Sequence, residues 1–281
     1  MQKDPLIDKI TRRSFDYQWT NLPAGEGLLS DEWFKNNVEE IISKEELCID
    51  RKWFSGRKIL DVGCGNGRWT YGFLRLGATV YSVDASVFAC KYVQKTFSKF
   101  SENLIVRQGN INDLPSDITK RKYDLVFCWG VLHHIKNSKQ AMMNIAQLVK
   151  DDGVFYTYLY GKDSMKLNLV TIKIKILRII LLPFSNFIKL KIINYLNREN
   201  QKKIHPSFDL LATPQNKRFL FTNIKNWLEE FGFTEIIQTI KHTELFIRAT
   251  RNNSSIIKYK LPASKPPYWF EKINQVNIMN K

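Results

Sequence analysis

Lys58-Ile-Leu-Asp-Val-Gly-Cys-Gly-Asn-Gly-Arg-Trp69 carries the strongest structural signal in the chain. It begins as a short apolar run typical of a buried strand, continues with Gly63, Gly65 and Gly67, and ends where Arg68 can begin a helix. Glycine has no Cβ, so a glycine-rich turn at a helix N-terminus lets backbone N–H groups approach a ligand closely. The stretch therefore predicts a ligand-binding turn between a strand and a helix.

Two carboxylates restrict the kind of ligand. Asp84 ends the next predicted strand, 21 residues after Gly63, which is about the spacing at which dinucleotide-type folds place an acid on ribose hydroxyls. Asp61 lies two residues before Gly63, where its charge would repel a pyrophosphate but suit a cationic ligand. S-Adenosylmethionine carries an ammonium and a sulfonium and lacks phosphate, so it satisfies both conditions.

Four segments, in order over about residues 57–160, resemble the class I S-adenosylmethionine-dependent methyltransferases. They are Leu60-Asp-Val-Gly-Cys-Gly-Asn-Gly67, Val83-Asp84-Ala85-Ser86, Gln108-Gly-Asn-Ile-Asn-Asp-Leu-Pro115 and Tyr123-Asp-Leu-Val-Phe-Cys-Trp-Gly-Val-Leu-His-His-Ile135. The resemblance implies an α/β fold with a Rossmann-like, doubly wound, seven-stranded sheet, helices on both faces and the last strand antiparallel. It also implies an enzyme whose cofactor is S-adenosylmethionine.

Strand and helix patterns alternate from Arg57 onward, as expected for a parallel doubly wound sheet. The predicted strands are about 57–63, 78–84, 104–109, 123–129, 152–160, 233–241 and 243–250. Asp152-Gly153 is predicted as the turn before the fifth strand, and 205–214 as a loop. The expected units are an N-terminal helical cap (1–56), the core (57–161 and 206–250), a basic amphipathic, α-helical insert after strand five (162–205) and a tail (251–281).

The resemblance implies roles for individual residues along the cofactor. The three glycines of the turn would allow close approach of the methionine and ribose portions. Asp61 would neutralise the ammonium through water or backbone, and Asp84, followed by Ala85, would accept both ribose hydroxyls. Trp129 stands just past strand four, where the family commonly contacts the cofactor.

Asn110 and Ile111 are placed against the adenine by the same resemblance. Many relatives have Asp where this chain has Asn110; an amide oxygen still accepts from the adenine amine, but more weakly. Asp113 is a candidate substitute. Upstream, Tyr17 and Trp19 belong to an aromatic segment similar to one that caps the cofactor in some relatives; alternatively, they attach an N-terminal helix to the domain.

His133 and His134 are the ionisable pair beside the expected reaction site. A histidine near its ordinary pKa can take the proton from a substrate hydroxyl or amine. Adjacent residues point in different directions, so we expect at most one to reach substrate and name His133 as the candidate catalytic base. If the acceptor is already deprotonated, no base is needed and both histidines are structural.

Half of the chain's excess positive charge lies in the insert. Of the formal net charge of +16, a net +8 falls between Lys162 and Lys203, among Ile, Leu and Phe residues. This pattern leaves open a lid over the substrate, a homo-oligomer interface, or peripheral contact of 165–196 with an anionic membrane.

The four cysteines show no metal or disulfide spacing, so we expect buried thiols, no metal, and a cytoplasmic or membrane-associated protein.

The leading functional hypothesis is methyl transfer to O or N of a small or lipid-linked metabolite, with a saccharide among the candidates. The basic insert favours an anionic acceptor. An RNA methyltransferase is the alternative raised by net charge, but nucleic acid is disfavoured because the insert's basic residues alternate with aliphatic rather than stacking aromatic residues. A cofactor-binding partner without turnover is a further alternative, opposed by the intact Asp61, glycines and Asp84.

Overall fold

The structure is a computed structural model and describes residues 6–22, 32–162, 169–198 and 204–251. The predicted tail therefore lies almost entirely outside the described residues. The helices are α1 (Leu6–Asn21), α2 (Glu32–Glu40), α3 (Arg68–Arg75), α4 (Val87–Thr96), α5 (Ser116–Thr119), α6 (Ser138–Ala146), α7 (Leu169–Leu181), α8 (Asn186–Leu196), α9 (Ile204–Ala212) and α10 (Phe221–Glu230). The strands are β1 (Lys58–Val62), β2 (Thr79–Asp84), β3 (Leu104–Gln108), β4 (Tyr123–Trp129), β5 (Val149–Leu159), β6 (Glu235–Gln238) and β7 (Leu245–Thr250).

The seven strands form one sheet in the order β3-β2-β1-β4-β5-β7-β6. Strands β1 to β5 pair in parallel, whereas β7 is antiparallel to both β5 and β6. The predicted fold class, a Rossmann-like seven-stranded sheet with an antiparallel last strand, is confirmed. The strand order reverses between β1 and β4, and in open α/β sheets ligands bind at the carboxyl ends of the strands at this switch point.

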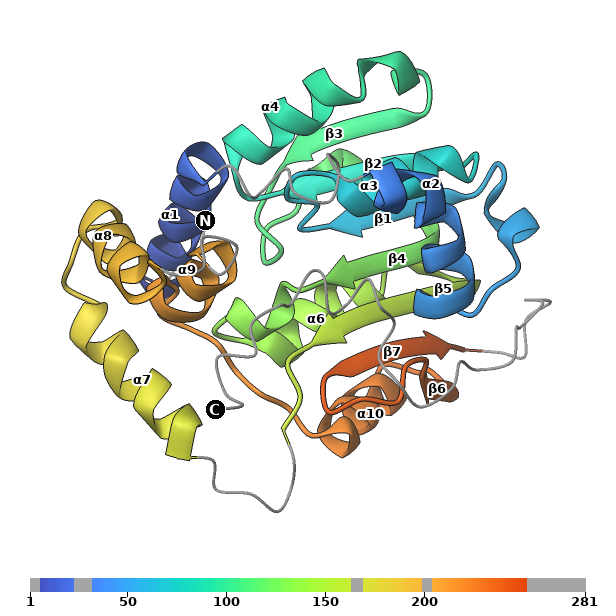
Figure 1. The fold of residues 1–281 in the computed structure, drawn as a ribbon. Coiled ribbons are helices and arrows are strands. Elements are labelled where there is room, and N and C mark those ends of the chain that lie inside the picture. The colour runs from blue at the N-terminus through green and yellow to red at the C-terminus, as the bar shows by residue number, and fades with distance from the viewer. Residues whose placement is uncertain (1–5, 23–31, 163–168, 199–203, 252–281) are drawn as a thin grey trace.

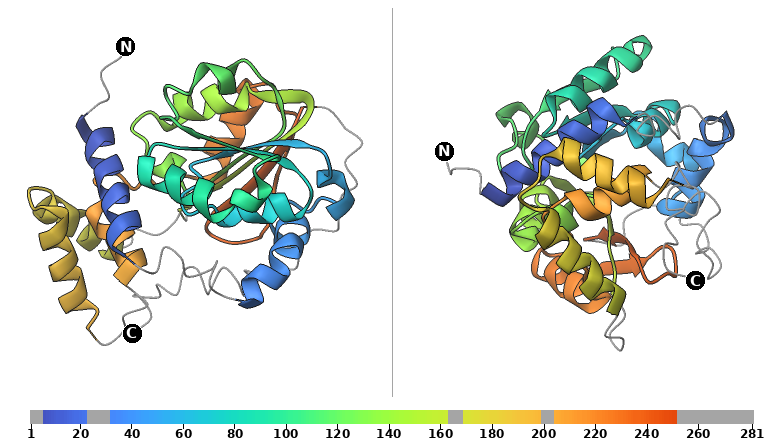
Figure 2. Two further views of the ribbon diagram at one scale, coloured as in Figure 1. Left: turned by 90° about the horizontal axis from the view of Figure 1, so that it is seen from above. Right: turned by 60° about the vertical axis from the view of Figure 1, so that its left-hand side comes forward.

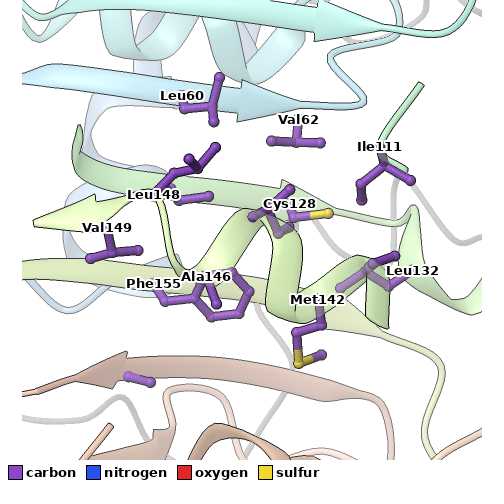
Figure 3. Packing of buried hydrophobic residues seen from close by; sticks show 14 of the residues in the cluster. Leu60, Val62, Ile111, Cys128, Leu132, Met142, Ala146, Leu148, Val149 and Phe155 are labelled. Atoms are coloured by element: carbon purple, nitrogen blue, oxygen red, sulfur yellow. The ribbon is translucent and has the colours of Figure 1, made fainter. Parts of the chain in front are cut away.

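Alternate residues of the strands point to opposite faces, and each face has its own apolar core. Ile59 and Phe127 pack with α2, α3 and α4 on one face. Leu60 and Val126 pack with α5, α6 and α10 on the other. Figure 3 shows this second core, with Leu60, Cys128 and Phe155 of the strands facing side chains such as Met142 of α6. Helices thus cover both faces, as predicted.

The segment after β5 forms a helical layer at the end of the sheet where the parallel strands finish (Figure 1). Helix α9 packs against α7, α8 and α1, and α1 packs in turn against α4 of the core. A third apolar cluster holds this layer together through residues that include Leu181, Ile193 and Phe208. Figure 2 shows α7 and α8 lying outside α1 and α9, farther from the sheet.

Two local predictions are corrected. Asp152 and Gly153 lie inside β5 rather than in a turn, because β5 pairs with β4 through a register irregularity: Val149 faces Tyr123 but Val154 faces Leu125. Residues 205–212 belong to helix α9 rather than to a loop. Pro206 did not prevent this helix, since proline is tolerated in a first helical turn where its missing N–H has no partner to lose.

Candidate active site

The glycine turn after β1 has a backbone that requires glycine. Gly63 and Gly65 have φ of 75° and 52°, a region that side-chain-bearing residues rarely adopt. A Cβ on Gly63 would lie 2.2 Å from Val131 Cγ2, and a Cβ on Gly65 would lie 2.7 Å from Trp19 Cζ2. The turn is tied to β2 by a hydrogen bond of 2.7 Å from Gly63 N to Val83 O. The turn is therefore tied to β2 and closely covered by side chains.

Asp84 at the end of β2 faces the glycine turn. Its Oδ2 accepts a hydrogen bond from Gly65 N at 2.9 Å, and its Oδ1 accepts one from Ser86 N at 2.8 Å. Burial raises the pKa of Asp84, and the charge of Asp16 on α1 acts in the same direction. Each carboxylate oxygen keeps a further lone pair, so Asp84 is held by the backbone while still able to accept ligand hydroxyls.

Asp61 lies beneath the turn and is only 2% exposed. Its Oδ2 accepts a hydrogen bond of 2.6 Å from Thr70 Oγ1 of α3, and Thr70 also bonds Ser82 Oγ at 2.8 Å. Burial raises the pKa of Asp61 to about 7, because the charged carboxylate loses water. The protonation of Asp61 is therefore sensitive to a nearby cation.

The N-terminal aromatic pair is split between two places. Trp19 of α1 lies against Gly65, with its ring in the space that a side chain on Gly65 would need. Tyr17 instead stacks on Phe208 of α9, with ring centroids 5.8 Å apart. The structure thus brings Trp19 to the glycine turn, and it places Tyr17 in the contact between α1 and α9.

The predicted adenine-side residues lie beyond β2 and β3. Gln108 Nε2 donates to Ala85 O at 3.2 Å, which joins the two strand ends. Asn110 Oδ1 accepts a hydrogen bond of 2.9 Å from Asn112 N, within a turn that Asn110 and Asp113 close as a bridge. Ile111 packs in the core of the second face. The oxygen expected to accept from adenine is thus also used to hold its own turn.

Trp129 ends β4 next to the turn, and it contacts residues that the sequence did not point to. Its ring stacks on Tyr158 with centroids 4.1 Å apart, and its Nε1 donates to Glu46 Oε1 at 3.3 Å. Glu46 also accepts a hydrogen bond from Tyr156 Oη. Burial raises the pKa of Glu46 to about 8. No sequence signal marked Glu46, which lies in an ordinary charged stretch of the cap and reaches Trp129 only through packing.

His133 and His134 follow β4, and neither is exposed. The His133 ring stacks on Tyr160 at 3.8 Å, and among the described residues its Nδ1 has no hydrogen-bond partner. Burial lowers the pKa of His133 well below its ordinary value. His134 Nδ1 lies 2.8 Å from Gln215 O, and its Nε2 lies 3.5 Å from Asp209 Oδ1 of α9. His134 therefore joins the end of β4 to α9 and the residues after it, whereas His133 is neutral at pH 7 and a weak base.

The described residues contain no group of three or more His, Cys, Asp or Glu side chains that could hold a metal ion. Nor is any helix in the described part of the chain long and apolar enough to cross a membrane. All four cysteines are buried and free.

A seven-stranded sheet of this order, with a glycine turn after β1 and an acid ending β2, defines a class I S-adenosylmethionine-dependent methyltransferase. A family model described as a methyltransferase domain matches residues 54–255. The chain belongs to this methyltransferase family.

Comparison with individual proteins agrees. The mitochondrial ubiquinone biosynthesis O-methyltransferase of Schizosaccharomyces pombe is 29% identical over 163 residues, covering 55% of this chain and 58% of that protein. The corresponding Actinobacillus pleuropneumoniae enzyme is 30% identical over 104 residues, covering 36% and 44%. The chain thus spans about half the length of the curated relatives it matches. The structure of magnesium protoporphyrin IX methyltransferase from Synechocystis PCC 6803 with bound S-adenosylmethionine has a similar fold, with a TM-score of 0.52 at 14% identity, covering 87% of this chain and 96% of that one.

Proposed function

We propose that this protein transfers a methyl group from S-adenosylmethionine to an oxygen or nitrogen of a small or lipid-linked molecule. The observation that carries the proposal is the pairing of Asp84 with the backbone of Gly65, in a turn where neither Gly63 nor Gly65 has room for a side chain. A carboxylate held in this way suits ribose hydroxyls, and a turn without Cβ atoms suits close approach of a nucleoside and its amino-acid tail.

The proposed roles follow the chemistry of each side chain. Asp84 accepts hydrogen bonds from the ribose hydroxyls, and Asp61 offsets the charge of the ammonium. The glycine turn lies against the part of the cofactor between these two groups. Asn110 and Ile111 border the adenine, and Trp19 covers the turn from outside. When bound, the cofactor supplies the sulfonium methyl group. The protein's part is to hold that group in line with the acceptor and exclude water, since alignment supplies much of the rate of such displacements.

Two observations support the acceptor class. The curated relatives are named O-methyltransferases, which favours oxygen as the methylated atom. Helices α7 and α8 lie at the same end of the sheet as the glycine turn (Figure 1). These helices and the link between them expose several large apolar residues. We call these exposed residues the outer face of the insert: Ile176, Ile179, Ile180, Leu182, Phe184, Phe187, Ile188, Tyr195 and Leu196.

Lysine and arginine border the outer face of the insert. Lys173, Lys175, Lys191 and Arg198 are all exposed, and α7 and α8 carry no acidic residue in their described spans. Exposed apolar side chains bordered by cations suit an anionic membrane surface, where apolar burial and lipid charge act together. Peripheral contact of 165–196 with a membrane would bring a lipid-linked, anionic acceptor to the ends of β4 and β5.

Incubation of the purified protein with methyl-labelled S-adenosylmethionine and a fractionated cell extract tests the proposal. We expect label in a lipid or small-metabolite fraction, and none when Asp84→Asn replaces the wild type. Label in RNA alone would contradict the proposed acceptor class. Failure of the wild type to bind S-adenosylhomocysteine, measured by calorimetry, would contradict the proposed function as a whole.

A further inference from the structure

Arg68 is a cation beside the glycine turn that the roles above do not use. It is the first residue of α3, and its guanidinium lies over the ring of Trp129 at 4.4 Å and near that of Trp69 at 5.4 Å. Burial lowers the pKa of Arg68 to about 10, so the side chain remains positively charged at neutral pH. In the part of the chain that the structure describes, its guanidinium makes no ion pair and no hydrogen bond.

The two carboxyl groups that interact electrostatically with Arg68 are hydrogen-bonded to other residues. Glu46 and Asp61 both act on it electrostatically. Glu46 accepts from Trp129 and Tyr156, however, and Asp61 accepts from Thr70. Arg68 is partly buried, and partial burial of a charge without a bonded partner is unfavourable. A cation at a helix N-terminus also opposes the helix dipole. Arg68 is therefore placed at a cost to stability, as residues reserved for a ligand are.

The ligand that fits Arg68 is an anion of low charge. Arginine presents a planar set of donors that matches a carboxylate through two parallel hydrogen bonds. A phosphate, with its higher charge, would be repelled by Asp61 and Asp84 at the same turn. Asp61 and Arg68 bracket the turn with opposite charges, which is the arrangement that a zwitterionic amino acid requires.

We propose that Arg68, oriented by Trp129, binds the α-carboxylate of the cofactor's amino-acid portion. This inference rests on the proposed function, since it assigns a group to one end of the same cofactor. Trp129 sets the plane of the guanidinium by stacking. Glu46 orients the Trp129 ring by accepting a hydrogen bond from Trp129 Nε1. Glu46 is then a positioning residue that acts through Trp129.

Calorimetry with three probes tests the assignment. S-Adenosylhomocysteine carries the ammonium and carboxylate, its decarboxylated analogue carries only the ammonium, and 5′-methylthioadenosine carries neither. We expect Arg68→Gln to weaken S-adenosylhomocysteine binding about 10- to 100-fold, which corresponds to the loss of a charged hydrogen bond. Binding of the other two probes should change less than about twofold, because neither offers a carboxylate. Arg68→Lys, which keeps the charge but loses the planar fork, should give an intermediate loss.

Controls separate this inference from the proposed function. Arg75→Gln, on the same helix but paired with Glu39, should leave all three affinities unchanged. Equal loss for all three probes, or no loss for S-adenosylhomocysteine, would overturn the role of Arg68 while leaving cofactor binding intact. The wild type gives an independent check should Arg68→Gln not fold: equal affinity for S-adenosylhomocysteine and its decarboxylated analogue would also overturn the assignment. A wild type that binds none of the probes would overturn the proposed function itself.

Discussion

The glycine-turn site and the outer face of the insert differ in how they treat polar and apolar side chains. The glycine-turn site consists of Asp61, residues 63–67, Asp84 and the covering Trp19, and its carboxylates are buried or partly buried and hydrogen-bonded. The outer face of the insert instead leaves large apolar side chains in water. Asp61 is 2% exposed, but Ile179 is 72% exposed and Tyr195 70%. Burying a carboxylate and exposing an isoleucine both cost free energy. Each region therefore has a composition that folding alone does not favour, and the partner we propose for each has complementary chemistry.

The two regions differ in how their partners would be recognised. In the glycine-turn site, single hydrogen bonds and the absence of a Cβ restrict the ligand, so one substitution should have a large effect. On the outer face of the insert, many similar side chains contribute small amounts, so one substitution should have little effect and several should add.

Gly65→Val should abolish measurable cofactor binding, with a loss of more than about 100-fold. A Cβ at this position would lie 2.7 Å from Trp19 Cζ2, and φ of 52° is strained for a β-branched residue. Overpacking and backbone strain together cost about 3–5 kcal/mol. Calorimetry with S-adenosylhomocysteine, alongside thermal melting, measures the effect.

Gly56→Val is the matched control for Gly65→Val. Gly56 also has positive φ, but nothing lies within 4 Å of a Cβ there, so the substitution should lower stability without changing cofactor affinity. Adding Trp19→Ala to Gly65→Val should restore part of the affinity by removing the clash. No recovery in the double variant would show that backbone strain, and not the Trp19 ring, limits the site.

The double substitution Ile179→Glu with Phe187→Glu should reduce binding to anionic lipid vesicles by about tenfold or more. It removes two exposed apolar contacts and adds charges that anionic lipid repels. Vesicle co-sedimentation measures the effect, and affinity for S-adenosylhomocysteine should not change. Met143→Glu, an exposed position on α6, serves as the control. Failure of the wild type to bind anionic vesicles would exclude the membrane as the partner of the outer face.

Cofactor affinity should rise by up to about tenfold as pH increases from 6 to 8. Burial raises the pKa of Asp61 to about 7, so its carboxyl is mostly protonated at pH 6 and mostly ionised at pH 8. A cationic ligand binds the ionised form, and binding should release a proton near neutral pH. Calorimetry in buffers of different ionisation enthalpy measures that proton. The Asp61→Asn variant should bind the cofactor more weakly, and its affinity should no longer change with pH through Asp61. A pH profile identical to that of the wild type would contradict the proposed contact between Asp61 and the ammonium.

The sequence predicted the sheet well because β-strand periodicity and the glycine turn are local signals. Periodicity alone is ambiguous at residues 172–176, since Ile172-Lys-Ile-Lys-Ile176 alternates as a strand does although it lies in α7. Glu46 and the separation of Tyr17 from Trp19 are decided by packing between segments far apart in the chain, for which one sequence carries no signal. The candidate site was thus predictable where it follows strand ends, and not where the cap and the insert contribute.

His133→Gln should lower turnover by less than about fivefold, the smallest effect expected. The imidazole is 1% exposed, stacks on Tyr160, and has its pKa held well below the ordinary value by burial. A base of such low pKa gains little from accepting a proton at neutral pH, whereas a positioned general base contributes about 10²–10⁴-fold. Steady-state kinetics with the acceptor identified by labelling decides between these roles. A loss above about 100-fold in kcat with KM unchanged would make His133 the general base, and it would show that the glycine-turn site extends past β4 toward the insert.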